Sequence, residues 1–546
     1  MAKQVIRLSE FHPYADGKTN DFTAFLQCFE KSKDEESIIV IEAGKYLIDG
    51  EYSIPLYANV SVIATDAEFI FPQVLGDKPH RIMFKGKNIS NFSWTGGLFR
   101  GFVYNPVHST GLWEPNANTK CIEIVRTPEG EARDIRFEKV RSIDVGGSVV
   151  SVSGTFEEDT WKRYPVYNVD VKSCTFENSG KFMWDYGYLW QRIVFPEFHS
   201  ESEVCNAYKY MPTELMSGEV SFSRTSAEIC VENMPEAIEK ESETVCFFGN
   251  VPAELKRGCC YYICSLKRRG ALTYITVSEQ PNGIPISCFS ANGKDCRLFR
   301  NLYTVHHAMY SPAGAGWGKG PMDLSVCDSV KVIDCRMNAS GDSMHVDKSH
   351  NVIVSGNHIT GSRMGAFYIA QYCKNVTVTA NTVLGTNGSR VLSVERSTED
   401  ITIVGNTFSG GGRGVWINQP YNIIMSDNIF SVNTNKCTPD PHIGRLTPNS
   451  GKYEYYPEIY FTTWQKNANY GAVIMRSNII KTSPYCSAAV AFHDGGKEIV
   501  FESNVIQGEK RDIYVGKHCE MPHMSGNIGM GNVIDELHEE KFDQKV

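Results

Sequence analysis

Acidic side chains alternate with aliphatic ones in two short stretches of the sequence, MDLSV and MHVD. In an extended strand successive side chains point to opposite faces, so the Met, Leu and Val residues of both stretches should face a core. The side chains then predicted to face outward are Asp323, Ser325, His345 and Asp347. The same alternation exposes Asp185, which lies between the bulky Trp184 and Tyr186.

Paired carboxyl groups of this kind are what the hydrolysis of a glycosidic bond requires. One carboxylic acid protonates the leaving oxygen, and the second group acts as nucleophile or base. Retaining enzymes hold the two groups about 5–5.5 Å apart, and inverting enzymes hold them about 6.5–9.5 Å apart. Repulsion between two nearby carboxylates also raises the pKa of one of them, which supplies the protonated acid. We therefore predict Asp185, Asp323 and Asp347 as the catalytic carboxylates.

Further polar and aromatic residues accompany these carboxylates. Glu395 is an additional candidate acid, and His345 could carry protons. Aromatic faces suit the apolar faces of sugar rings, and Arg side chains can hold carboxylate or hydroxyl pairs. The predicted substrate-binding residues are Trp184, Trp190, Trp317, Arg363, Tyr368, Gln371, Trp416 and Trp464. A single His-x-Asp pair on a strand is weak support for a metal site, so we expect no metal and no cofactor.

The elements that must position these residues repeat along the chain. Alternating aliphatic residues that end in asparagine recur as NVIVSGN, NVTVTAN, DITIVGN, NIIMSDN, AVIMRSN and EIVFESN. The closing asparagines lie 24, 25, 22, 50 and 26 residues apart, and we interpret the interval of 50 as two periods. The alternation favours strands over helices, and asparagine suits a tight turn because it tolerates left-handed backbone and can hydrogen-bond a stacked neighbour. The sequence therefore predicts an all-β fold, a right-handed parallel β-helix.

A strand that precedes each repeat should form one wall of this solenoid. Such strands are predicted at residues 183–190, 320–326, 341–349, 365–372, 390–397, 413–420 and 488–495. If an insertion occupies one turn, Asp185, Asp323 and Asp347 fall on three successive coils. Parallel strands are about 4.8 Å apart, so carboxylates would lie about 5 Å apart on adjacent coils and about 9.6 Å apart on alternate coils.

The opening of the chain suggests how the solenoid begins. An amphipathic helix is predicted from Asn20 or Asp21 to about Lys33, where it would cover the open end of the first coil. The stretch ADGKTNDFTAFLQCFEKS, followed by IIVIEAGKYLI, resembles the opening of the pectate-lyase-like β-helix enzymes. This resemblance implies a carbohydrate-active enzyme whose substrate cleft lies on the outer face of the strand before each repeat. It also implies that an inserted domain flanks the substrate site.

The repeat disappears in the middle of the sequence, where short alternating runs are separated by turn signals such as Pro281-Asn282-Gly283. We predict three parts: the N-terminal cap and first coils at residues 1–195, a small inserted β-domain at 196–300, and the remaining coils with a charged tail at 301–546.

Composition narrows the range of partners. The net charge of −9 disfavours nucleic acid and anionic membranes as partners, and no apolar run is long enough to span a membrane.

The 17 cysteines are odd in number and many lie in strand patterns, which suits buried thiols in a reducing compartment. The first residues lack the apolar core of a signal peptide. A cytoplasmic location is therefore expected, and these features do not specify an oligomeric state.

Three functions are compatible with this scaffold. The first is a glycoside hydrolase acting on an oligosaccharide or polysaccharide. The second is a polysaccharide lyase or uronate epimerase, in which Lys, Arg or His removes the proton next to a uronic carboxylate. The third is a non-catalytic carbohydrate-binding solenoid. The sequence lacks the Asn-Thr-Asp, Asp-Asp, Gly-His-Gly and Arg-Ile-Lys set of polygalacturonases, and the absence of a basic groove disfavours polyanionic substrates. The outward acids and aromatics favour a glycoside hydrolase with a carbohydrate substrate.

Overall fold

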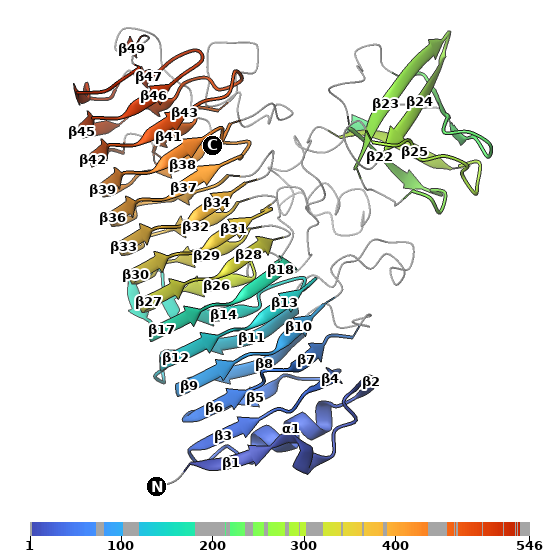
Figure 1. Ribbon diagram of the computed structural model, residues 1–546, viewed down its shortest axis with the longest axis vertical. Coiled ribbons are helices and arrows are strands. Elements are labelled where there is room, and N and C mark those ends of the chain that lie inside the picture. Colours follow the sequence, from blue (N-terminus) through green and yellow to red (C-terminus); the bar gives the residue numbers. More distant parts are fainter. Residues whose placement is uncertain are drawn as a thin grey trace.

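The protein winds into a solenoid in which each coil adds one strand to each of three parallel sheets (Figure 1). The predicted all-β parallel β-helix is therefore confirmed. The structure is a computed structural model, and it describes residues 3–72, 81–101, 119–180, 213–214, 219–234, 244–255, 260–278, 283–293, 295–301, 320–339, 342–362, 365–385, 390–434, 456–463, 465, 468–493, 495–516, 518–529, 531 and 533–535.

Sheet A carries the repeated segments that end in asparagine. All its strand pairs are parallel, and neighbouring strands come from successive coils. In spatial order its strands are β1 (Gln4–Arg7), β3 (Ser37–Val40), β6 (Val60–Ile63), β9 (Ser90–Thr95), β12 (Arg133–Glu138), β17 (Val166–Lys172), β27 (Cys327–Ile333), β30 (His350–Ser355), β33 (Lys374–Thr379), β36 (Glu399–Val404), β39 (Tyr421–Ser426), β42 (Tyr470–Arg476), β45 (Gly496–Glu502) and β48 (His523–Ser525).

Sheet B follows sheet A in each coil across a short turn. Its strands are β2 (Asp16–Asn20), β4 (Gly44–Leu47), β7 (Ala67–Ile70), β10 (Leu98–Arg100), β13 (Arg141–Ile143), β18 (Thr175–Ser179), β28 (Arg336–Ala339), β31 (His358–Thr360), β34 (Thr382–Leu384), β37 (Thr407–Ser409), β40 (Ile429–Ser431), β43 (Ile479–Lys481) and β46 (Val505–Gln507).

Sheet C contains the predicted wall strands except the one at residues 183–190, which lies outside the described residues, and it precedes sheet A in each coil. Its strands are β5 (Ile54–Leu56), β8 (Arg81–Lys87), β11 (Thr119–Val125), β14 (Val150–Ser153), β26 (Met322–Ser325), β29 (Met344–Asp347), β32 (Phe367–Ala370), β35 (Ser393–Val394), β38 (Val415–Asn418), β41 (Ile459–Thr462), β44 (Val490–Phe492), β47 (Ile513–Val515) and β49 (Val533–Asp535).

A ladder of asparagines, buried except at its last member Asn527, joins the turns between sheets A and B. The side-chain amide of each member donates to the side-chain oxygen of the next at 2.9–3.1 Å. The residue before each asparagine, such as Ala380 at φ 55, has the left-handed backbone, and not the asparagine itself as the sequence suggested. The ladder consists of Asn357, Asn381, Asn406, Asn428, Asn478, Asn504 and Asn527.

The interpretation of the 50-residue interval as two periods is wrong. The side-chain amide of Asn428 donates directly to Asn478 at 3.0 Å, and β39 pairs with β42. The interval is therefore one coil that carries extra residues between β40 and β41, within residues 432–458. The repeat period alone could not distinguish a missing coil from a lengthened turn.

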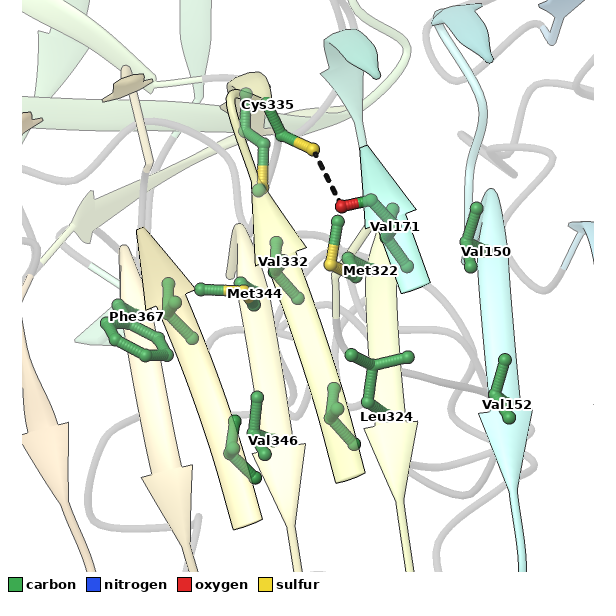
Figure 2. Packing of buried hydrophobic residues seen from close by; sticks show 14 of the residues in the cluster. Val150, Val152, Val171, Met322, Leu324, Val332, Cys335, Met344, Val346 and Phe367 are labelled. Carbon is green, nitrogen blue, oxygen red and sulfur yellow. Dashed lines mark hydrogen bonds between the residues drawn. The ribbon is translucent and has the colours of Figure 1, made fainter. Parts of the chain in front are cut away.

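The core fills the interior of the solenoid with alternate side chains of the strands. Figure 2 shows Met322, Leu324, Met344 and Val346 pointing into this core, and all four are fully buried. The predicted alternation is confirmed, so the intervening residues of β26 and β29 face outward.

A helix closes the N-terminal end of the core, as predicted. Helix α1 (Phe22–Glu30) follows a short 3-10 helix, η1 (Leu8–Phe11), and buries Phe25 and Phe29 among aromatic rings of the first coils. Asp21 makes no capping hydrogen bond; its carboxylate instead accepts from the backbone of Tyr14 and Ala15. No helix in the described ranges is long and apolar enough to cross a membrane.

Two additional β-units leave the coils. The hairpin β15 (Thr155–Glu157) and β16 (Lys162–Tyr164) extends from the turn after β14. A separate antiparallel sheet lies beside the solenoid in Figure 1. It contains β19 (Thr213–Glu214), β20 (Val220–Phe222), β21 (Ile229–Glu232), β22 (Thr244–Gly249), β23 (Cys260–Arg269), β24 (Leu272–Ser278) and β25 (Cys296–Asn301). The predicted boundaries at 195 and 300 stay predictions, because much of the flanking sequence lies outside the described residues.

Candidate active site

The outer face of sheet C arranges polar and aromatic side chains in two columns that run along the solenoid. Strand register sets these columns, since outward positions of neighbouring coils lie opposite each other in the parallel sheet. Column one comprises Ser151, Asp323, His345, Tyr368, Ser393, Trp416 and Tyr460. Column two lies two residues further along the strands and comprises Ser153, Ser325, Asp347 and Ala370.

Three adjacent members of column one carry titratable side chains. A carboxylate oxygen of Asp323 lies 3.5 Å from Nδ1 of His345, and the imidazole and phenol ring centroids of His345 and Tyr368 are 5.8 Å apart. Burial raises the pKa of the Tyr368 phenol well above its usual range, so this group keeps its proton at neutral pH. Carboxylate, imidazole and phenol therefore form a continuous polar row on successive coils.

Asp347 in column two is held by an ion pair. Its Oδ2 lies 2.9 Å from Nζ of Lys348 and accepts a hydrogen bond from the Ser325 hydroxyl at 3.1 Å. The same Nζ donates to Oε1 of Gln371, one coil further, at 2.8 Å. Only 13% of the Asp347 side chain and 14% of the Lys348 side chain are exposed, so the pair is weakly screened by solvent and its position is well defined.

The two central carboxylates are diagonal neighbours, which differs from the predicted stacking. Ser151 lies beside Asp323 on the preceding coil, and His345 lies beside it on the following coil. Asp347 lies beside Ser325. The predicted succession of three aspartates on three coils is therefore wrong for the position before Asp323. One coil spacing of about 4.8 Å and two residues of about 3.3 Å each place Asp323 and Asp347 about 8 Å apart at the backbone.

Glu395 extends column two. Its backbone N–H donates to Ile369, and its carbonyl accepts from Gln371, so Glu395 aligns with Ala370. This register places it two coils beyond Asp347, which corresponds to about 9.6 Å. Leu392 and Val394 point into the core as predicted.

Trp416 faces outward but is largely covered. Its indole Nε1 donates to the hydroxyl of Thr462 at 2.8 Å, and the guanidinium carbon of Arg390 lies 4.4 Å from the ring centroid. The ring also contacts a small aromatic cluster that contains Tyr456 and Tyr460. These contacts give Trp416 a packing role. The side chain of Gln371 accepts a hydrogen bond from Lys348, and its role in substrate binding stays a prediction.

Several predicted site residues lie outside the described residues. They are Asp185, Trp184, Trp190, Trp317, Arg363 and Trp464. Their roles stay predictions. Among the residues that the structure describes, no group of three His, Cys, Asp or Glu side chains could hold a metal ion.

The hairpin β15–β16 contributes residues that the sequence did not single out. One guanidinium nitrogen of Arg163 donates to the carbonyl of Lys348 at 2.8 Å and to that of Cys327 at 3.2 Å. Its other terminal nitrogen lies 2.6 Å from Nδ1 of His350. Burial and the nearby guanidinium lower the pKa of His350, so this imidazole is neutral and accepts the bond. Arg163 thereby fixes the turn that carries Lys348.

A sequence signal for this hairpin was present. The acidic turn of residues 158–161 separates the short alternating runs TFE and KRY. The partners of Arg163 on the next coils are 164 to 187 residues away in the chain, and no local pattern reveals contacts at that separation.

Comparisons with known proteins agree with this architecture. The family model "Right handed beta helix region" matches residues 321–438, which confirms the predicted handedness; the chain is a right-handed parallel β-helix protein. A search of the curated proteins found no match.

Solved structures with a similar fold include the A-module of a mannuronan C-5 epimerase from Azotobacter vinelandii, at 9% identity and a TM-score of 0.49 over 97% of this chain and 99% of that one. A surface adhesin of Streptococcus pneumoniae has 9% identity and a TM-score of 0.45 over 97% and 93% of the two chains. An exopolygalacturonase from Thermotoga maritima has 11% identity and a TM-score of 0.42 over 96% and 93%. These similarities concern the fold alone.

Proposed function

We propose that this protein is a glycoside hydrolase in which Asp323 and Asp347 supply the acid and the base. The observation that carries the proposal is the register of β26 and β29. This register gives the two aspartates a backbone separation of about 8 Å. Both side chains point outward from the same sheet, so their carboxyl groups should be separated by a similar distance, within the range of about 6.5–9.5 Å of inverting enzymes. Such a separation is what leaves room for the attacking water molecule in those enzymes.

The neighbours of the two aspartates argue against the retaining mechanism. That mechanism needs a second carboxylate at about 5 Å. The positions directly beside the two aspartates in their columns are occupied by Ser151, His345, Ser325 and Ala370. We therefore expect inversion at the anomeric carbon.

The surroundings suggest which carboxylate has which role. Lys348 compensates a negative charge on Asp347 at 2.9 Å, as a base that activates water requires. Asp323 adjoins His345 at 3.5 Å, a group through which a proton can be returned after each turnover. We assign the base to Asp347 and the acid to Asp323.

The proposal is tested by replacing each acid with its amide. Asp323→Asn and Asp347→Asn should each lower kcat on a cleaved glycan or aryl glycoside by about 10³-fold, the typical contribution of an acid or base. Thermal stability should stay close to that of the unmodified protein. A matched control is Asp427→Asn, because Asp427 is exposed and its left-handed backbone, at φ 56, also suits asparagine. Retention of activity in both variants, or retained product stereochemistry by NMR, contradicts the proposal.

A second candidate is a lyase or epimerase acting on a uronic glycan. The row of Asp323, His345 and Tyr368 favours it, since an imidazole next to a protonated phenol can remove one proton and deliver another. Release of unsaturated uronate, measured by absorbance, together with its loss in His345→Ala, would support this chemistry. Release of reducing sugar without that absorbance supports hydrolysis.

A further inference from the structure

The hairpin β15–β16 holds a tryptophan in solvent near the candidate active site. Trp161 is 61% exposed although it makes perpendicular contacts with two rings. Its ring centroid lies 5.8 Å from that of Phe156 and 4.9 Å from that of Tyr372. The backbone of Trp161 is left-handed, with φ 56, a conformation that bulky residues rarely adopt. Packing alone does not explain a large exposed ring on a strained backbone, and such strain often accompanies function.

The two rings that contact Trp161 link it to Asp347. Nζ of Lys348, the ion-pair partner of Asp347, lies 5.7 Å from the centroid of the Phe156 ring. Tyr372 follows the glutamine whose side chain accepts a hydrogen bond from the same Nζ. The exposed indole is therefore connected to the carboxylate through two intervening side chains, Phe156 and Lys348.

The base of the hairpin fixes this arrangement across coils. Arg163, two residues after Trp161, binds the carbonyls of Cys327 and Lys348. The hairpin that carries the indole is thus attached to the same turn that positions the ion pair.

We infer that Trp161 forms an aromatic sugar-binding subsite that holds an uncharged hexopyranose ring of a glycan next to the cleavage site. The inference rests on the proposed function, because it takes Asp323 and Asp347 as the acid and the base that cleave the glycan. An exposed indole offers an apolar face to the C–H groups of a pyranose ring. Its contact with Phe156, whose ring lies near Lys348, would let the neighbouring sugar unit reach the carboxylates.

Charge at the hairpin selects against uronic sugars. Glu157, Glu158 and Asp159 directly precede the tip, whereas Nζ of Lys162 lies over the ring of Tyr164 at 4.7 Å. The other nearby cations are engaged as well, since Arg163 binds two backbone carbonyls and His350, and Lys348 pairs with Asp347. A uronate carboxylate at this tip would meet like charges, which disfavours binding. The subsite therefore fits a neutral or N-acetylated sugar, and this preference favours hydrolysis over uronate chemistry.

Equilibrium binding tests the subsite without turnover. Binding of neutral, N-acetylated and uronic hexasaccharides is measured by calorimetry with the full-length Asp323→Asn variant as the background. Adding Trp161→Ala should raise the Kd for the bound neutral or N-acetylated hexasaccharide about 10- to 100-fold, and Trp161→Phe should keep most of the affinity. Tyr52→Ala is a matched control, since Tyr52 is also 61% exposed and makes one perpendicular ring contact, with Phe22 at 5.3 Å.

The outcomes separate this inference from the proposed function. Unchanged affinity in Trp161→Ala, an equal loss in Tyr52→Ala, binding of uronic hexasaccharides only, or no binding of any hexasaccharide overturns the subsite. If the binding depends on Trp161 while Asp323→Asn and Asp347→Asn retain turnover in the kinetic test, the subsite stands and the assignment of the two carboxylates fails.

Discussion

The two turns that flank sheet A in each coil are built in different ways. Between sheets A and B, the coils from Asn357 to Asn504 repeat one left-handed residue followed by a buried asparagine. Between sheets C and A the residues change from coil to coil. The left-handed positions there include Val326, Lys348, Gln371, Tyr372, Arg396, Ser397 and Gln419. The first turn uses identical side chains to satisfy one another, whereas the second presents different side chains to its surroundings.

This difference separates stability from chemistry within a single coil. A buried amide must be hydrogen-bonded, and the ladder meets this need only if each coil supplies the same residue. The turn from sheet C to sheet A is free of that requirement, so it can hold Lys348 against Asp347 and can accept the contacts of the hairpin. Substitutions in the two turns should therefore have opposite signatures.

The largest effect on stability is expected in the ladder. Asn406→Ala removes the acceptor for the backbone and amide of Asn381 and the donor to Asn428. Each buried polar group left without a partner costs about 1–3 kcal/mol, so the free energy of unfolding should fall by about 3–5 kcal/mol. Denaturant unfolding measures this loss, and kcat per folded molecule should change little.

The exposed Asn375 provides the matched control for this substitution. Its amide donates to Asn351 at 3.0 Å on the surface, and its backbone is left-handed at φ 55. Asn375→Gly therefore removes the side chain without backbone strain and should cost less than about 1 kcal/mol. A similar loss in both variants would show that burial of the ladder does not account for its contribution.

The opposite signature is expected for Lys348→Met, which keeps the aliphatic stem and removes the ammonium. We expect kcat to fall about 10- to 30-fold with KM nearly unchanged, because the loss concerns the positioning and charge of Asp347 and not sugar binding. The melting temperature should change by only a few degrees. Lys374→Met is the control, since Lys374 pairs with Glu399 at 3.0 Å with nearly half of each side chain exposed. Equal kinetic effects in both variants would remove Lys348 from the active site.

The turn from sheet B to sheet C is of a third kind, because its contribution to the free energy of unfolding should depend on pH. The fully buried carboxylate of Glu458 accepts from the backbone and amide of Asn433 at 2.8 Å and from the backbone of Thr434 at 3.2 Å. Burial outweighs these donors and raises the pKa of Glu458 from 4.5 to about 8. The carboxyl group of Glu458 therefore accepts hydrogen bonds across a turn as the amides of the ladder do, but unlike an amide it can be protonated.

Between pH 4.5 and about 8, folding is therefore coupled to the uptake of a proton by Glu458. Below pH 4.5 the group is protonated in both states, and above it only the folded state keeps the proton. The free energy of unfolding should fall by about 1.4 kcal/mol per pH unit as the pH rises towards 8. Glu458→Gln should abolish this slope, measured as the melting temperature against pH. A slope that persists in the variant would assign it to other groups.

The parts of the fold that depend on local patterns could be predicted from sequence. Alternation identified the wall strands and the outward position of Asp323 and Asp347, and the closing asparagines identified the ladder. The pairing of strands from neighbouring coils could not be predicted. Because a long insertion separates β18 from β26, the sequence does not reveal that β14 is the strand that pairs with the Asp323 strand. Arg163 and Trp161 were missed for a related reason, since their partners lie on coils far along the chain. Lys348 directly follows Asp347 in sequence, but its own backbone is left-handed, at φ 47, and this conformation turns its side chain back onto the carboxylate.

The pairing of β18 with β28 shows how readily this architecture can acquire new parts. Thr175 and Arg336 are neighbours in one sheet, although the chain between them includes the antiparallel sheet of β19–β25. The entropy of closing a loop grows only with the logarithm of its length, so this detour costs about 2 kcal/mol more than an ordinary coil. A solenoid can therefore accept an entire extra domain in one turn, while the coils on either side of the insertion keep their strand register. Its architecture suits evolution by insertion.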